Sequence, residues 1–335
     1  MTYFVWAGFF AIYVTLLALD LGVLHRESKV LSVKQAIGWT GVWIVVAFSF
    51  SLLVYGLYEH HWFGWAATAG VPDGRSAVLQ YITGYLLEWT LSVDNIFVIA
   101  VIFTYMKIPV TYQYRVLFWG IVGAIVLRGV MIAVGSALIH AFDWTFYLFG
   151  AILLVSAARM LRNEEEYDPS TSLLVRMARR VYPITDNLDG ERFFTRVDGK
   201  WAATPLFVTL LFVDFADAVF AVDSIPAIFA VTQDPFLVFT SNAFAILGLR
   251  SLYFAIAGLM AMFRYIKISL VFILGFVGIK MMLHHHVDIP NLLSLFVIVA
   301  FLAIGILASA WVSRREKMAG HGKGMLEGEG PGEGL

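Results

Sequence analysis

Long apolar runs separated by short polar stretches dominate the pattern of hydrophobic and polar positions along this chain. We predict nine membrane-spanning helices, at residues 3–22, 36–57, 78–105, 113–138, 144–161, 204–231, 236–261, 268–284 and 290–312. Most of these runs are close to the ~20 residues with which an α-helix crosses roughly 30 Å of hydrocarbon. A transmembrane barrel would instead show short segments of alternating apolar and polar residues. The pattern therefore predicts an all-α polytopic membrane protein.

Basic residues gather in every second loop of this prediction. They are His25, Arg26, Lys29, Lys34, Lys107, Arg115, Arg162, Arg176, Arg179, Arg180, Arg264, Lys267, Arg314, Arg315 and Lys317. Because loops rich in Lys and Arg stay in the cytoplasm, we expect the N-terminus outside and the C-terminus in the cytoplasm of a plasma (inner) membrane. The run 3–22 lacks a basic region before it and a cleavage site after it, so we interpret it as a retained first span.

We expect one transmembrane domain, 1–312, with a cytoplasmic loop at 162–203 and a disordered Gly- and Glu-rich tail at 313–335. The loop is interpreted as a solvated connector with one amphipathic helix at 170–181. The alternative is a regulatory or metal-sensing loop. Homo-oligomers or membrane protein partners would associate through this loop.

Composition agrees with a membrane protein and removes several function classes. Hydrophobic residues make up 60% of the chain, charged residues 14%, and the mean hydropathy is +0.80. The net charge of −1 gives no electrostatic reason to expect nucleic acid binding. Without cysteine there are no disulfides or thiolate metal sites. No nucleotide-binding loop or hydrolase nucleophile motif is present, so we expect neither an enzyme nor a prosthetic group.

One acidic phrase occurs twice in the apolar sequence. Residues 88–95, EWTLSVDN, align with residues 217–224, DAVFAVDS, so that acid matches acid at two positions. Downstream, AIVLRGVMIAVG and AILGLRSLYFAIAG place Arg128 and Arg250 in corresponding positions. A unit of at least two helices is therefore repeated.

The repeated cores, about 78–138 and 204–261, begin on opposite sides of the membrane in the predicted topology. This arrangement is an inverted repeat, which is typical of secondary transporters with a substrate site near the midplane.

The repeat concentrates acids where lipid would exclude them. The acids concerned are Glu88, Asp94, Asp214, Asp217 and Asp223. Each costs about 2.5–3.5 kcal/mol near the middle of the bilayer, and two arginines cannot neutralise all five. A cation bound by the carboxylates and by the side chains of Asn95 and Ser224 would neutralise the surplus negative charge. Such an oxygen site suits Mn²⁺, Ca²⁺ or Mg²⁺. The alternative is structural: the acids pair with Arg128 and Arg250 and only hold helices together.

Helical spacing leaves the shape of this site open. Residues seven apart share a helix face, which pairs Glu88 with Asn95 and Asp217 with Ser224. Asp94 and Asp223 fall about 120° from their partner acids on a straight helix. Either the helices stay regular and the acids face different neighbours, or the helices unwind and the acids converge. Pro226 favours a break in the second copy.

Other polar residues have two readings each. Asp20 is a gate or secondary ion site, or an interfacial acid beside the basic loop. Asn242 is a helix cap or a contributor to the site. Arg128 and Arg250 are interpreted as partners of the acids that can also set a carboxylate pKa. The adjacent histidines 284–286 diverge by about 100° each on a helix, which makes a poor single metal site.

Five segments closely resemble the TerC family of integral membrane proteins. They are ALDLGVLHR, EWTLSVDNIFV, RFFTRVDGKWAATPLF, FADAVFAVDSIPAIFAVTQDPF and TSNAFAILGLRSLYF, and the resemblance extends to about residue 312. It implies a bacterial-type inner-membrane metal exporter, with manganese efflux as the activity. The resemblance also implies that the metal-linked acids are Glu88, Asp94, Asp217 and Asp223, beside Asn95 and Ser224. Asp214 stands where many relatives have glutamate.

The sequence therefore predicts a divalent cation exporter, with Mn²⁺ as the transported ion, that works by alternating access and couples to proton entry. Two alternatives stay open. One is a Ca²⁺ transporter. The other is a non-transporting membrane scaffold linked to metal loading or tellurite resistance.

Overall fold

The computed structural model describes residues 2–20, 32–65, 71–162, 185, 188–197, 199–257, 266–284, 286–287 and 289–326. The helices are α1 (Thr2–Ala18), α2 (Val33–Glu59), η2 (Trp62–Gly64), α3 (Gly74–Tyr105), α4 (Val110–Ala141), α5 (Thr145–Arg162), α7 (Pro205–Phe229), α8 (Pro235–Ile246), α9 (Leu249–Ala257), α10 (Ile266–Met282) and α11 (Asn291–Leu326). Two strands, β1 (Phe194–Val197) and β2 (Lys200–Ala203), form an antiparallel hairpin.

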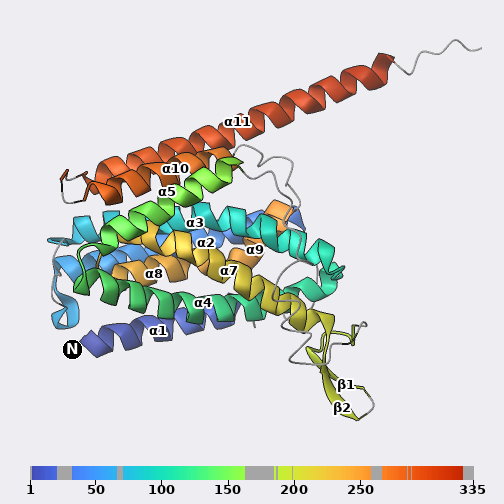
Figure 1. Ribbon diagram of the computed structural model, residues 1–335, viewed down its shortest axis with the longest axis horizontal. Helices are drawn as coiled ribbons and strands as arrows, with labels where there is room; N and C mark the ends of the chain where they lie inside the picture. The colour runs from blue at the N-terminus through green and yellow to red at the C-terminus, as the bar shows by residue number, and fades with distance from the viewer. Residues whose placement is uncertain are drawn as a thin grey trace, which may run out of the picture.

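The long helices lie side by side in one bundle with α3 near its centre (Figure 1). Within the most apolar stretch of each helix, 67% of α3 is buried, against 28% of α2 and 22% of α11. Helices α2, α7 and α8 pack against α3, while α5, α10 and α11 form a layer on one side of the bundle. A polar side chain on the inner face of α3 is therefore far from lipid.

The predicted segments agree with helices along the described chain. Five helices are long and apolar enough to cross a membrane, and a sixth span results if the bent pair α8–α9 is counted as one. Helices α1, α5 and α10 are shorter but apolar, and they overlap the first, fifth and eighth predicted segments. The protein is thus built as a polytopic membrane protein, and nine crossings stay a prediction.

Polar residues define where several helices begin. Ser32 and Gln35 form a capping box at the start of α2. Asp73 caps α3 by accepting a hydrogen bond from the Ser76 backbone N–H at 2.6 Å. The hydrogen bonds from Ser76 hold the pKa of the Asp73 carboxyl below its ordinary value. Asp234 caps α8 in the same way and is followed by proline at the first helical position.

The helix break lies in a different span from the one that the sequence favoured. Helix α7 continues through Pro226 to Phe229, so the predicted break there is corrected. Pro226 sits in the last turn, where its missing N–H disturbs little of the helix. Instead, the predicted span 236–261 is divided into α8 and α9, which meet at a bend of 45°. Gly248 lies at this bend with φ +83°, a conformation that favours glycine.

Two other regions differ from the sequence prediction. Helix α11 runs on to Leu326, past the predicted start of the disordered tail at 313. Extending an existing helix needs no new nucleation, and the segment SRREKMA contains good helix formers. The hairpin β1–β2 lies in the loop that we interpreted as a connector. The predicted helix at 170–181 lies outside the described residues.

Candidate functional site

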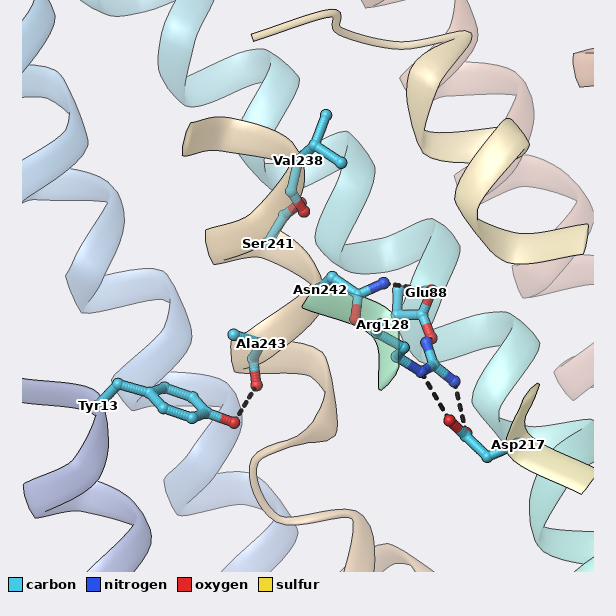
Figure 2. Close-up of polar contacts among 8 residues, drawn as sticks. All are labelled: Tyr13, Glu88, Arg128, Asp217, Val238, Ser241, Asn242 and Ala243. Atoms are coloured by element: carbon cyan, nitrogen blue, oxygen red, sulfur yellow. Dashed lines mark hydrogen bonds and ion pairs between the residues drawn. The ribbon is translucent and has the colours of Figure 1, made fainter. Parts of the chain in front are cut away.

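A buried ion-pair cluster joins the two copies of the repeat. Arg128 on α4 donates to both carboxyl oxygens of Asp217 on α7, from Nε at 3.0 Å and from one terminal nitrogen at 2.7 Å. Its other terminal nitrogen pairs with Glu88 on α3. Figure 2 shows the guanidinium between the two carboxylates. The arginine of the first copy thus binds the first acid of both copies.

The cluster is shielded from solvent. The exposed fraction of the side chain is 0% for Glu88, 2% for Arg128 and 13% for Asp217. One guanidinium faces two carboxyls, which leaves one negative charge over if both carboxyls are ionised. Charges in a low-dielectric environment interact strongly and are costly to leave uncompensated. The excess negative charge can therefore attract a further cation.

Asn242 on α8 completes the cluster. Its side-chain nitrogen donates to the second carboxyl oxygen of Glu88 at 3.1 Å (Figure 2). The two helices approach closely here, because a Cβ atom on Gly84 would lie 2.8 Å from the Ser241 hydroxyl. The residue that caps α8 is Asp234, so the capping interpretation of Asn242 is corrected. Each of α3, α4, α7 and α8 contributes one side chain.

Asp214 lies one turn before Asp217 on α7 and faces α4. A Cβ atom on Gly123 of α4 would lie 2.9–3.0 Å from the Asp214 carboxyl group. The glycine therefore leaves room for this carboxylate between the helices. Oδ1 of Asp214 is buried without a hydrogen-bond partner among the described residues.

The second acid of each copy does not join the cluster. Asp94 lies within the electrostatic influence of Lys267 on α10. Asp223 accepts a hydrogen bond from Ser156 on α5 at 2.6 Å and is close to the charge of Arg159. Since α3 and α7 are regular helices, each of these acids is rotated about 120° from its partner. The acids thus face different neighbours, one of the two arrangements that the spacing allowed.

Three buried oxygens lie on the helix faces that carry Glu88 and Asp217. Asn95 and Ser92 share the face of Glu88, and Ser224 shares that of Asp217. Asn95 Oδ1 and both serine hydroxyls have no hydrogen-bond partner in the part of the chain that the structure describes. Other helical hydroxyls, such as Thr83, donate to the carbonyl four residues earlier. These three oxygens are therefore available to a ligand, as is the Ser251 hydroxyl on α9.

Arg250 occupies a different place from its counterpart. It donates to the backbone carbonyl of Asp20 at 2.8 Å and lies 3.5 Å from the Asp20 carboxylate. Its guanidinium also stacks over the Tyr114 ring, 4.9 Å from the centroid. Asp20 is fully buried within the protein, and both interpretations of this acid, gate or interfacial acid, stay predictions. The pair joins the segment just after α1 to α9.

The described residues contain no group of three or more His, Asp or Glu side chains that could hold a metal ion. His284 stacks on Phe146 with 4.3 Å between ring centroids, while its neighbour His285 lies outside the described residues. The predicted ligands Glu88, Asp94, Asp217 and Asp223 are thus divided between the arginine cluster and two separate positions.

Known proteins with similar sequences cover nearly the whole chain. An uncharacterized membrane protein of Myxococcus xanthus, STKORF319, is 48% identical over 92% of this chain and 92% of its own. The "Putative membrane-bound redox modulator Alx" of Photorhabdus laumondii is 44% identical over 92% of this chain and 95% of its own. The protein of that name from Escherichia coli is 42% identical over 94% and 97%. No solved structure matches.

The sequence pattern described as "Integral membrane protein TerC family" matches residues 73–317. This region contains α3, α4, α7 and α8 and therefore all four residues of the buried cluster. The chain belongs to the TerC family of integral membrane proteins.

Proposed function

We propose that this protein exports a divalent metal cation, with Mn²⁺ as the first candidate and Ca²⁺ as the alternative. The observation that carries the proposal is the buried cluster of Glu88, Arg128, Asp217 and Asn242, which takes one side chain from each of four helices. A carboxylate site between two repeated units would repel anions and attract cations. Carboxylate, amide and hydroxyl oxygens are ligands that Mn²⁺ and Ca²⁺ accept.

Arg128 has the role of a built-in cation in this proposal. Its guanidinium occupies the position between Glu88 and Asp217 where a transported ion would be attracted. A divalent ion has twice the charge and would leave the two carboxylates neutral overall. We infer that metal entry moves the guanidinium away from one carboxylate. The oxygens of Ser92, Asn95 and Ser224 are then additional ligands on the same helix faces.

Asp94 and Asp223 would bind the ion before it enters the buried cluster and after it leaves. Each lies six residues beyond its partner acid, or about 9 Å along the helix. Helices α3 and α7 run in opposite directions in the bundle (Figure 1). The two acids are therefore displaced in opposite directions along the helix axes. This order suits alternating access, in which one side of the site opens at a time.

The test is Mn²⁺ flux in liposomes that contain the purified protein. We expect Glu88→Gln and Asp217→Asn to abolish flux, and Asp94→Asn and Asp223→Asn to reduce it. The matched control is Asp143→Asn, which changes an exposed acid in the α4–α5 turn and should transport as the unchanged chain does. Proton coupling predicts that collapse of an imposed pH gradient lowers the flux. Full activity in Glu88→Gln and Asp217→Asn would reject the site.

A second candidate follows from the names of the relatives. The Photorhabdus laumondii and Escherichia coli proteins are called membrane-bound redox modulators. This chain has no cysteine, so a redox role would not run through its own thiols. An exporter could alter redox balance indirectly by changing the level of a metal ion. A scaffold would need loop 162–203 and no ion path, so absence of Mn²⁺ and Ca²⁺ flux in the unchanged protein would favour it.

A further inference from the structure

The hairpin β1–β2 is attached directly to the start of a membrane-spanning helix. Only Thr204 separates the end of β2 from α7. The Thr204 hydroxyl donates to the carbonyls of Arg192 at 2.7 Å and Phe193 at 3.1 Å, and its N–H bonds to the Phe193 carbonyl at 2.9 Å. Thr204 is fully buried. The base of the hairpin therefore cannot turn independently of α7.

A second set of contacts fixes the hairpin to α4. Arg115, in the second turn of α4, lies 3.6 Å from the Glu191 carboxylate and stacks over the Phe193 ring at 5.1 Å. Phe194 packs on Phe207 of α7, with 4.5 Å between ring centroids. The base of the hairpin is thus held by two helices of the bundle.

One face of the hairpin combines an aromatic and a basic side chain. Arg196 is paired with Trp201 across the two strands, and Phe194 is paired with Ala203 on the same face. The Arg196 guanidinium lies over the Trp201 ring at 4.8 Å. Trp201 nevertheless has an exposed fraction of 57%. The opposite face carries Thr195, which donates to Asp189 at 2.7 Å, and Val197, which has an exposed fraction of 46%.

The hairpin also lies where a bilayer surface is expected. Because one residue separates it from α7, its base is at the level where that helix enters the membrane. In Figure 1 the strands run across the direction of the helices and extend past the edge of the bundle, beyond α1. A structure at this level and outside the outline of the described helices is positioned to reach the lipid surface.

We propose that the Arg196–Trp201 face rests on negatively charged phospholipid headgroups of the surrounding bilayer. Trp is enriched at the membrane–water interface because its ring is amphipathic. The planar guanidinium of Arg matches phosphate oxygens and can remain stacked on an aromatic ring while it binds them. The hairpin then anchors the start of α7 at the membrane surface, and with it the helix that carries Asp217. This inference does not depend on which ion is transported.

The absence of cysteine makes a direct test possible, since one introduced cysteine is the only site for a thiol-reactive dye. We would label Trp201→Cys with an aromatic dye, which takes the place of the indole ring, and Val197→Cys on the opposite face, in protein reconstituted into vesicles of phosphatidylglycerol and phosphatidylethanolamine. Spin-labelled lipid quenches a dye near the headgroups, and iodide quenches a dye in water. We expect lipid quenching at position 201 to exceed that at position 197, with the opposite order for iodide.

Removal of the arginine should weaken the contact. Arg196→Gln, combined with Trp201→Cys, should lower the ratio of membrane-bound to free hairpin about fivefold in the charged vesicles, which is the effect of one basic residue near an anionic surface. In vesicles of phosphatidylcholine alone, Arg196→Gln should have little effect. Equal iodide quenching at positions 201 and 197, without lipid quenching at either, would overturn the proposal and favour a soluble protein partner for this face. Unchanged lipid quenching in Arg196→Gln would overturn the role of the charged headgroup.

Discussion

At the scale of single residues, Arg128 decides whether two buried acids are tolerated. Replacing it by glutamine leaves Glu88, with an exposed fraction of 0%, as a buried charge without its ion-pair partner. We expect Arg128→Gln to lower the free energy of unfolding by about 3–5 kcal/mol, the usual cost of removing one partner of a buried ion pair. Reversible denaturation in detergent, followed by tryptophan fluorescence, measures this loss.

The matched variant adds Glu88→Gln to Arg128→Gln. Because the second change removes the stranded charge, the double variant should be more stable than Arg128→Gln alone. Such coupling is the sign that two residues act as a pair. Strictly additive losses would mean that Arg128 stabilises the bundle through packing and not through Glu88. The double variant also separates stability from transport. It lacks the Glu88 carboxylate, so its stability can recover without a recovery of transport.

At the scale of elements, the bend between α8 and α9 is the strongest departure from regular helix. Gly248 has φ +83°, and a Cβ atom there would lie 2.5 Å from the Trp43 ring. We expect Gly248→Ala to destabilise the protein by about 1–3 kcal/mol, because it adds backbone strain to a steric clash. Gly275→Ala in α10 is the control, since open space surrounds that position. The control should be neutral or up to about 1 kcal/mol more stable. Equal effects of the two changes, measured by thermal unfolding, would contradict this account of the bend.

Elements are also the scale at which the sequence was most informative. Apart from the end of α11 and the division into α8 and α9, apolar runs marked the helices within a few residues. The repeated acidic phrase marked the face of α3 that carries Glu88. The pairing of Arg128 with acids was among the alternatives. The contact of Asn242 with Glu88 joins residues 154 positions apart, so no local pattern specifies it. The hairpin, by contrast, has a local sequence signal: the Asp198-Gly199 pair between its strands is typical of a two-residue hairpin turn.

Bends are harder to predict than helices. Pro226 has an intrinsic tendency to break a helix, but its place in the last turn of α7 makes it harmless. Gly248 has no such tendency by itself, since glycine occurs in the apolar helices of this protein without a bend. The packing of Trp43 against Gly248 distinguishes this position, and that contact exists only in the folded bundle.

At the scale of the whole molecule, the membrane topology decides the side of the membrane from which each repeat starts. In Figure 1 the α2–α3 and α4–α5 connections lie at the end of the bundle that holds the N-terminus, and the α3–α4 connection lies at the other end. With the N-terminus outside, cysteines introduced as His60→Cys and Asp143→Cys should react with a membrane-impermeant maleimide in intact cells. A cysteine introduced as Lys107→Cys should react only after the membrane is opened.

This labelling pattern bears on the transport proposal as well as on topology. If α3 runs inward and α7 runs outward, Asp94 lies on the cytoplasmic side of the Arg128 cluster and Asp223 on the outer side. Cytoplasmic metal would then meet Asp94 before the cluster and Asp223 after it. Reaction of all three cysteines in intact cells would mean that these connections do not alternate between the two sides of the membrane, and this order of sites would then be wrong. Reaction of Lys107→Cys alone would reverse the order, so that cytoplasmic metal would meet Asp223 before the cluster and Asp94 after it.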